Sequence, residues 1–176
     1  MKTLEHFLYE QKIKTRLPHV YLDMDGVLVN LMKGAEKVHG KPLDQVPKPM
    51  KWDKISQVEN FWRDLEWMPG AKKLWNFLKP YAPSIMSAYA RSEPNSAKGK
   101  EDWLKKNVEP LSRGRINLVM RSDKQRFARD GRTQMPNILV DDHAKNIREW
   151  EAKGGIGIHH TSVDKTIAKL KELGFA

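Results

Sequence analysis

The chain has 176 residues, enough for one globular core with a small insertion but too few for two ordinary domains. It contains no cysteine, so disulfides, thiolate metal sites and thiol nucleophiles are excluded. Its 32 Lys and Arg residues outnumber its 22 Asp and Glu residues, and the net charge of +10 favours an anionic partner. No apolar run reaches the roughly 18 residues of a membrane span and no signal peptide is evident, so we expect a cytoplasmic protein without membrane association.

Two carboxylates lie where the first predicted strand ends. After an amphipathic helix expected over residues 3–15, residues 19–23 are typical of a strand buried on both faces. Asp23 ends this strand, Asp25 follows it and Gly26 breaks it. The carboxyl ends of parallel strands line the ligand crevice of an open sheet, where a dehydrated carboxylate needs a cation or hydrogen-bond donors. The pair therefore predicts a magnesium site, a proton-exchanging role or both, although Asp-x-Asp-Gly is also ordinary turn chemistry.

The next segment combines a helix with a run of aromatic residues. Residues 30–39 are predicted to be helical, and a connection rich in proline then leads to residues 52–67, where we also expect helical structure. Phe61 and Trp62 belong to this run. Aromatic side chains of a small unit usually form its core, but one placed over a catalytic crevice can stack on a nucleobase.

The remainder of the chain alternates strands with helices. This pattern predicts an α/β fold, a Rossmann-like parallel five-stranded sheet with right-handed crossovers and helices on both faces. Ser87 ends the second strand and Lys124 follows the third. Further strands are predicted at 84–87, 116–120, 137–141 and 156–159, and helices at 71–78, 96–107, from 144, and 163–170.

The fourth strand runs directly into two acids, Asp141 and Asp142. Adjacent carboxylates repel each other and raise each other's pKa unless a cation intervenes, which indicates a metal role for Asp141. Asp142 could instead cap the helix that begins near Ala144. A second charged feature is the basic region 98–132, which is either a set of solvated cations or a surface for nucleic acid.

Several motifs, in the same order along the chain, resemble those of known phosphatases. The run from Asp23 to Leu28 resembles the first motif of the haloacid dehalogenase superfamily. The order and spacing of all the motifs are most similar to those of the 5'(3')-deoxyribonucleotidases. The further motifs are Phe61 to Ala71, Ile85 to Ser87, Arg121 to Lys124, and Ile138 to Asp142.

The resemblance implies a domain organisation and a strand order. Residues 17–32 and 68–176 would form the catalytic core, residues 33–67 a small helical cap, and residues 1–16 an N-terminal helix packed on the core. The first strand would be central, with the second and third on one side and the fourth and fifth on the other.

The resemblance also implies roles for the acids. Asp23 would be the nucleophile that forms an aspartyl-phosphate, and Asp25 would protonate the leaving oxygen and then activate water. Mg²⁺ would be held by the Asp23 carboxylate, the Asp25 backbone carbonyl and Asp141, with Asp142 behind these ligands.

The implied substrate is a nucleoside monophosphate. Ser87, the Ala88 amide and Lys124 would bind its phosphoryl oxygens, and Phe61 and Trp62 would hold its base. The related enzymes have a second hydroxyl where this chain has Ala88, so their selectivity does not transfer directly. Two alternatives remain open: a phosphatase that processes nucleic-acid ends through the region 98–132, and a non-catalytic binding protein with this fold.

Overall fold

The computed structural model describes residues 16–176. The helix expected over residues 3–15, and its packing on the core, lie outside this range. Within the described residues no helix is both long and apolar enough to cross a membrane. The strands are β1 (Val20–Leu22), β2 (Ser84–Ala88), β3 (Ile116–Val119), β4 (Ile138–Asp141) and β5 (Ile156–His159), and the α-helices are α2 (Leu31–His39), α3 (Ala71–Leu78), α4 (Ser96–Asn107), α5 (Ala144–Ala152) and α6 (Val163–Glu172).

The five strands form one parallel sheet in the order β3-β2-β1-β4-β5, which confirms the predicted order. The chain moves outward from β1 to β3 on one side, then returns past β1 to β4. The order therefore reverses between β1 and β4, which is where ligands bind in open α/β sheets. Leu22 pairs with Val140 on one side and with Ile85 on the other, so Asp23, Asp141 and Ser87 reach the same edge of the sheet.

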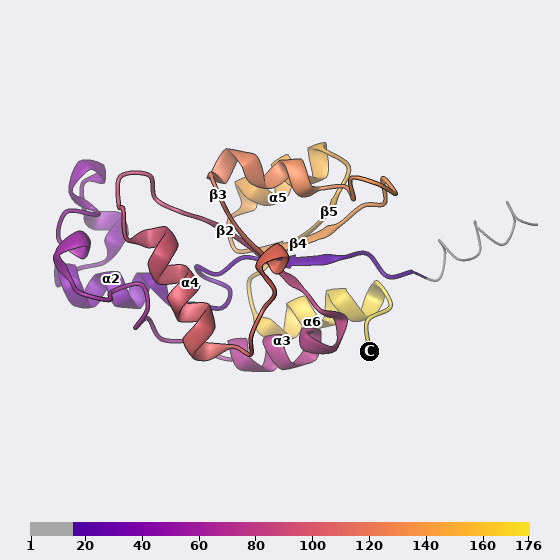
Figure 1. Ribbon diagram of the computed structural model, residues 1–176, viewed down its shortest axis with the longest axis horizontal. Helices are drawn as coiled ribbons and strands as arrows, with labels where there is room; N and C mark the ends of the chain where they lie inside the picture. Colours follow the sequence, from indigo (N-terminus) through magenta and orange to yellow (C-terminus); the bar gives the residue numbers. More distant parts are fainter. Residues whose placement is uncertain (1–15) are drawn as a thin grey trace, which may run out of the picture.

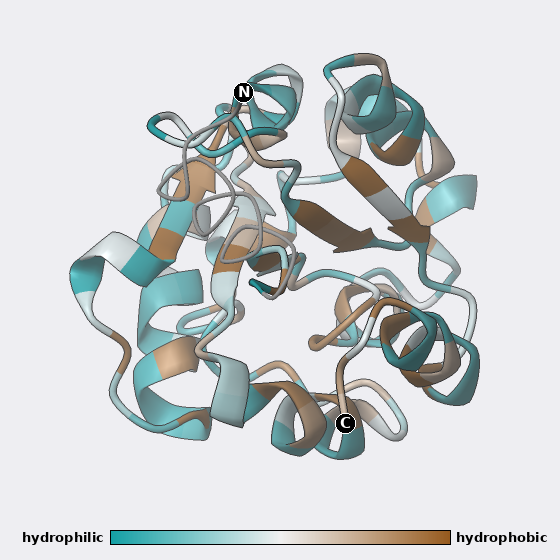
Figure 2. Ribbon diagram, turned by 90° about the vertical axis from the view of Figure 1, so that its right-hand side faces the viewer, coloured by the Kyte–Doolittle hydropathy of each residue, from teal (hydrophilic) through white to brown (hydrophobic). Residues whose placement is uncertain are grey.

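The alternation of side chains along the strands creates two apolar cores, one on each face of the sheet. On one face, residues of α3, α4 and α6 pack on strand residues such as Leu22 and Val140. On the other face, α5 packs through Trp150 on Leu139 and Met86. Figure 1 shows α5 on one side of the sheet and α3 and α6 on the other. Figure 2 shows brown apolar strands between helices whose outer surfaces are largely teal.

The segment from α2 to Trp67, called the insertion below, lies beyond the carboxyl ends of the strands, at the left of Figure 1. Its α-helix, α2, begins after Asn30, whose side chain accepts a hydrogen bond from the Lys33 amide at 3.2 Å. Gly40 caps its carboxyl end with a φ of 69°, a left-handed conformation that glycine adopts easily because it has no Cβ. Short 3-10 helices follow at Leu43–Gln45, Lys48–Met50 and Ile55–Gln57.

The prediction of helical structure across 52–67 was wrong for most of that segment. Beyond the single 3-10 helix, successive turns carry the chain to Trp67. Contacts with α4 explain the difference, because Trp103 donates its indole N–H to the Leu65 carbonyl at 2.8 Å and its ring lies 4.8 Å from that of Trp67. Tertiary packing therefore determines this backbone, against the local pattern.

Candidate active site

Asp23 lies at the end of the central strand, with 6 % of its surface exposed. Its amide donates to the Val140 carbonyl at 3.0 Å, which ties it to β4. Its Oδ1 accepts the Met24 amide at 2.7 Å and its Oδ2 pairs with Lys124 Nζ at 2.8 Å. These contacts orient the Asp23 carboxylate and leave some of its lone pairs unused, because a carboxylate offers about four acceptor sites.

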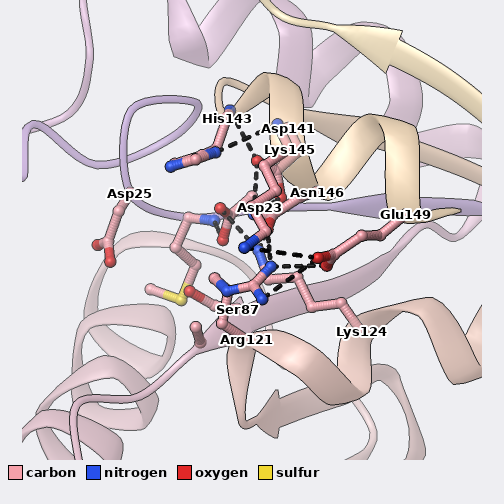
Figure 3. Close-up of polar contacts among 12 residues, drawn as sticks. Asp23, Asp25, Ser87, Arg121, Lys124, Asp141, His143, Lys145, Asn146 and Glu149 are labelled. Atoms are coloured by element: carbon pink, nitrogen blue, oxygen red, sulfur yellow. Dashed lines mark hydrogen bonds and ion pairs between the residues drawn. The ribbon is translucent and has the colours of Figure 1, made fainter.

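Lys124 bridges two of the acids (Figure 3). It lies in the 3-10 helix Arg121–Phe127 after β3, is 2 % exposed, and pairs with Asp141 Oδ2 at 2.7 Å as well as with Asp23. Burial alone would lower the pKa of Lys124, but the two carboxylates outweigh it and raise the pKa. An ammonium group has three hydrogens, and within residues 16–176 only these two acceptors are in range. The third hydrogen is free for an anionic ligand.

Asp141 is fully buried and its acceptor sites are filled. Besides Lys124, its carboxylate accepts the His143 amide at 2.8 Å and the Asn146 side chain at 3.0 Å on each oxygen. Arg121 in turn donates to the Asn146 Oδ1 at 3.1 Å. Burial, and then the charge of Asp23, raise the pKa of Asp141. Sequence reasoning missed Asn146, because a single polar residue on the inner face of a helix belongs to no motif.

Asp142 occupies a more open position. It is exposed, and the only donor to its carboxylate among the described residues is its own backbone amide. A Cβ at Gly26, where φ is +76°, would lie 2.2 Å from Asp142 Oδ2, so this acid lies directly against the loop after β1. Partial loss of water, and then the charges of Asp23 and Asp141, raise the pKa of Asp142 to about 6. Asp142 does not cap α5, because His143 is the N-cap residue.

The structure adds a residue that sequence reasoning missed, Lys100 of α4. This lysine is 2 % exposed, and its Nζ donates to Asp25 Oδ2 at 2.6 Å, to Ser87 Oγ at 2.9 Å and to the Ala88 carbonyl at 2.7 Å. Within residues 16–176, no donor reaches the buried Asp25 Oδ1. The ring of Trp62 covers the ammonium group at 5.4 Å. A lone lysine in a helix carries no motif, so only the fold reveals this role.

Asp23 and Asp25 have opposite electrostatic environments. Burial opposes ionisation of Asp23, yet the ammonium groups of Lys124 and Lys100 hold its pKa below the usual range. Burial raises the pKa of Asp25, Lys100 offsets only part of this, and the charge of Asp23 raises it further. Two carboxyl groups two residues apart are thereby suited to different tasks, one as an anion and the other as a proton carrier.

The donor set fits a divalent cation. One oxygen from each of Asp23, Asp141 and Asp142 lies within 4.8 Å of the others. Together with Asp25 these carboxylates outnumber the two buried ammonium groups, Lys100 and Lys124, by two formal negative charges. Such an oxygen-only set, with few protein ligands, is what Mg²⁺ prefers.

Phe61 and Trp62 belong to the larger of the two apolar clusters, with 7 % and 4 % of their surfaces exposed. The indole N–H of Trp62 donates to the buried Glu93, in the loop after β2. Both rings also line a cavity of about 300 Å³ between the insertion and α4. Their contact with a substrate base stays a prediction.

The cations of the basic region 98–132 differ in their surroundings. Two of its lysines, Lys100 and Lys124, are buried among the acids. Several others pair with acidic side chains; these are Lys98, Lys105, Lys106, Arg121 and Arg126. Lys100 and Lys124 are therefore not available to a nucleic acid, and contact of the other cations with one stays a prediction.

No family model matches the sequence, and a search of curated proteins finds no match. Solved structures do share the fold. A hydrolase from Streptococcus pneumoniae TIGR4 superposes with a TM-score of 0.56 at 12 % identity, over 89 % of this chain and 100 % of that one. A hydrolase from Pseudomonas syringae gives a TM-score of 0.51 at 16 % identity, over 90 % of this chain and 91 % of that one. At these identities the likeness establishes the α/β fold.

Proposed function

We propose that this protein is a magnesium-dependent phosphomonoester hydrolase that acts through an aspartyl-phosphate on Asp23. One observation carries the proposal: Asp23 and Asp25 are each held by a separate buried lysine, Lys124 and Lys100 respectively. A simple turn of the type Asp-x-Asp-Gly has no need of such lysines. A protein that only binds a ligand has no need of both a nucleophile and a proton carrier. The motif resemblance to the haloacid dehalogenase superfamily supports the same conclusion, as do the two hydrolases that share the fold.

Mg²⁺ would be held by the Asp23 carboxylate, the Asp25 carbonyl and Asp142. This assignment changes the expectation that Asp141 is the ligand, because protein donors fill the acceptor sites of Asp141, whereas among the described residues only its own amide donates to Asp142. Asp141 would instead hold Lys124 in place. The ion would supply positive charge that offsets the charge of the phosphoryl group.

In the first step, a free lone pair of Asp23 attacks the phosphorus atom and forms a new O–P bond. The ester O–P bond breaks, and Asp25 gives its proton to the leaving oxygen, which departs as an alcohol. The third hydrogen of Lys124, the hydroxyl of Ser87 and the Ala88 amide would donate to the phosphoryl oxygens.

In the second step, Asp25 accepts a proton from water as that water attacks the phosphorus atom. The bond between Asp23 and phosphorus breaks, inorganic phosphate leaves, and both carboxyl groups return to their starting states. Burial of Asp25, which favours its protonated form, suits the first step, and its loss of that proton prepares it for the second.

For the substrate we propose a nucleoside monophosphate, as for a 5'(3')-deoxyribonucleotidase. The Phe61-Trp62 pair and its spacing from Asp23 support this choice through the resemblance.

The test is phosphate release with Mg²⁺ from deoxy- and ribonucleoside 5'- and 3'-monophosphates and from end-phosphorylated oligonucleotides, with Asp23→Asn as the blank. We expect mononucleotides to be hydrolysed with little dependence on salt. Preference for oligonucleotides, with a steep loss of affinity between low and moderate salt, would contradict the substrate assignment. Equal turnover by Asp23→Asn would contradict the mechanism.

A further inference from the structure

Lys100 has the contacts of a residue that orients others. Its ammonium group has three hydrogens and three acceptors, namely Asp25 Oδ2, Ser87 Oγ and the Ala88 carbonyl, at 2.6 to 2.9 Å. No hydrogen remains for a phosphoryl oxygen. Lys100 therefore differs from Lys124, which has one hydrogen unused by the described residues.

The contact with Asp25 distinguishes its two oxygens. Lys100 binds Oδ2, whereas Oδ1 is buried and receives no donor from the described part of the chain. A buried acceptor without a donor is unfavourable, and a ligand that brings a hydrogen would remove this cost. Oδ1 is thus the oxygen that is left to exchange a proton with a substrate or water.

The contact of Lys100 with Ser87 orients a hydroxyl in a similar way. Ser87 is fully buried, and its Oγ accepts from Lys100. Its own hydrogen has no acceptor in range among residues 16–176. Since the acceptor side of the hydroxyl is occupied, its O–H is directed away from Lys100 and is available to a phosphoryl oxygen.

We propose that Lys100 is a positioning residue that orients the Asp25 carboxyl and the Ser87 hydroxyl together for phosphoryl transfer. The insertion helps to hold Lys100, because the centre of the Trp62 ring lies 5.4 Å from the lysine Nζ. The indole N–H of Trp62 in turn donates to Glu93 of the loop after β2. Removing this lysine should impair the proton transfers that depend on Asp25 more than the attack by Asp23. The inference rests on the proposed function.

The test compares an alkyl phosphate, whose leaving oxygen needs a proton, with 4-nitrophenyl phosphate, whose leaving group departs without one. For Lys100→Met we expect kcat/KM on the alkyl ester to fall on the order of 10²-fold, as for loss of a general acid, and much less on the aryl ester. Phosphorylated enzyme should also accumulate on acid quenching with the aryl ester, because Asp25 no longer activates water well. Lys105→Met, an exposed lysine of the same helix, is the control and should match the wild type.

A double variant keeps the test decisive if the single variant folds poorly. Asp25→Asn with Lys100→Met removes both charges of the pair, and we expect it to show the ester ratio of Asp25→Asn alone. Circular dichroism and thermal unfolding monitor the fold of each variant. Equal losses on both esters without phosphorylated enzyme, or a further loss in the double variant, would overturn the positioning role. Absence of phosphate release by the wild type would instead overturn the proposed function.

Discussion

Replacement of Asp142 by Asn should stabilise the metal-free protein and abolish its response to Mg²⁺. The pKa of Asp142 is raised from 3.8 to about 6, and a shift of this size would correspond to about 3 kcal/mol of unfavourable interaction for the ionised form at neutral pH. Because the side chain is exposed, solvent screening reduces the expected gain to about 1 kcal/mol. For a domain of this size that corresponds to a rise in Tm of roughly 2 to 4 °C.

The assay is thermal unfolding at neutral pH, with EDTA and then with Mg²⁺. Mg²⁺ at 100 times its Kd should stabilise the wild type by about 2.7 kcal/mol, because it binds only the folded state. We expect Asp142→Asn to unfold at a higher temperature than the wild type in EDTA and to show no further rise with Mg²⁺. The matched control is Asp53→Asn, an exposed acid of the insertion, which should behave as the wild type. A lower Tm in EDTA, or an undiminished Mg²⁺ response, would refute the assignment of Asp142 as a ligand.

Two further predictions concern glycine and histidine positions. Gly26→Ala and Gly40→Ala both place a Cβ at positive φ, but only the Cβ at position 26 meets Asp142. Chemical denaturation should therefore show a larger loss of unfolding free energy for Gly26→Ala. Mg²⁺ titration should show weaker binding in that variant alone. Burial, and then nearby cationic charge, lower the pKa of His19, which bonds Ser84 Oγ at 2.8 Å. The lowered pKa means that His19 contributes to the free energy of unfolding above pH 6.5, and that this contribution is lost as the pH falls. The free energy of urea unfolding should therefore change less between pH 7.5 and pH 5.5 in His19→Asn than in the wild type. An equal pH effect in both proteins would show that this histidine is not responsible.

The parallel sheet follows from local patterns, because apolar runs separated by helical segments define its strands. That Asp23 and Asp141 reach the same edge follows too, whereas their close approach depends on the strand order, which was expected from the resemblance. The side on which Asp141 lies also follows from the pleat, because it alternates with Val140 and so faces α5 and Lys124.

Other features depend on contacts between segments that are distant in sequence. Lys100 is buried because Asp25 and Ser87 accept its hydrogens and Trp62 covers it, and no periodicity within α4 encodes these partners. The turns of residues 52–67 likewise depend on Trp103 of α4. The different roles proposed for Asp141 and Asp142 depend on the hydrogen-bond partners of each carboxylate, which no sequence pattern supplies.

The most direct test of the account is mass spectrometry of the protein after acid quenching during turnover of a phosphomonoester with Mg²⁺. We predict one phosphoryl group on the peptide that contains Asp23, lost in Asp23→Asn and absent when Mg²⁺ is removed. A phosphoryl group on another residue, or turnover by Asp23→Asn at the rate of the wild type, would contradict the assignment of Asp23 as the nucleophile.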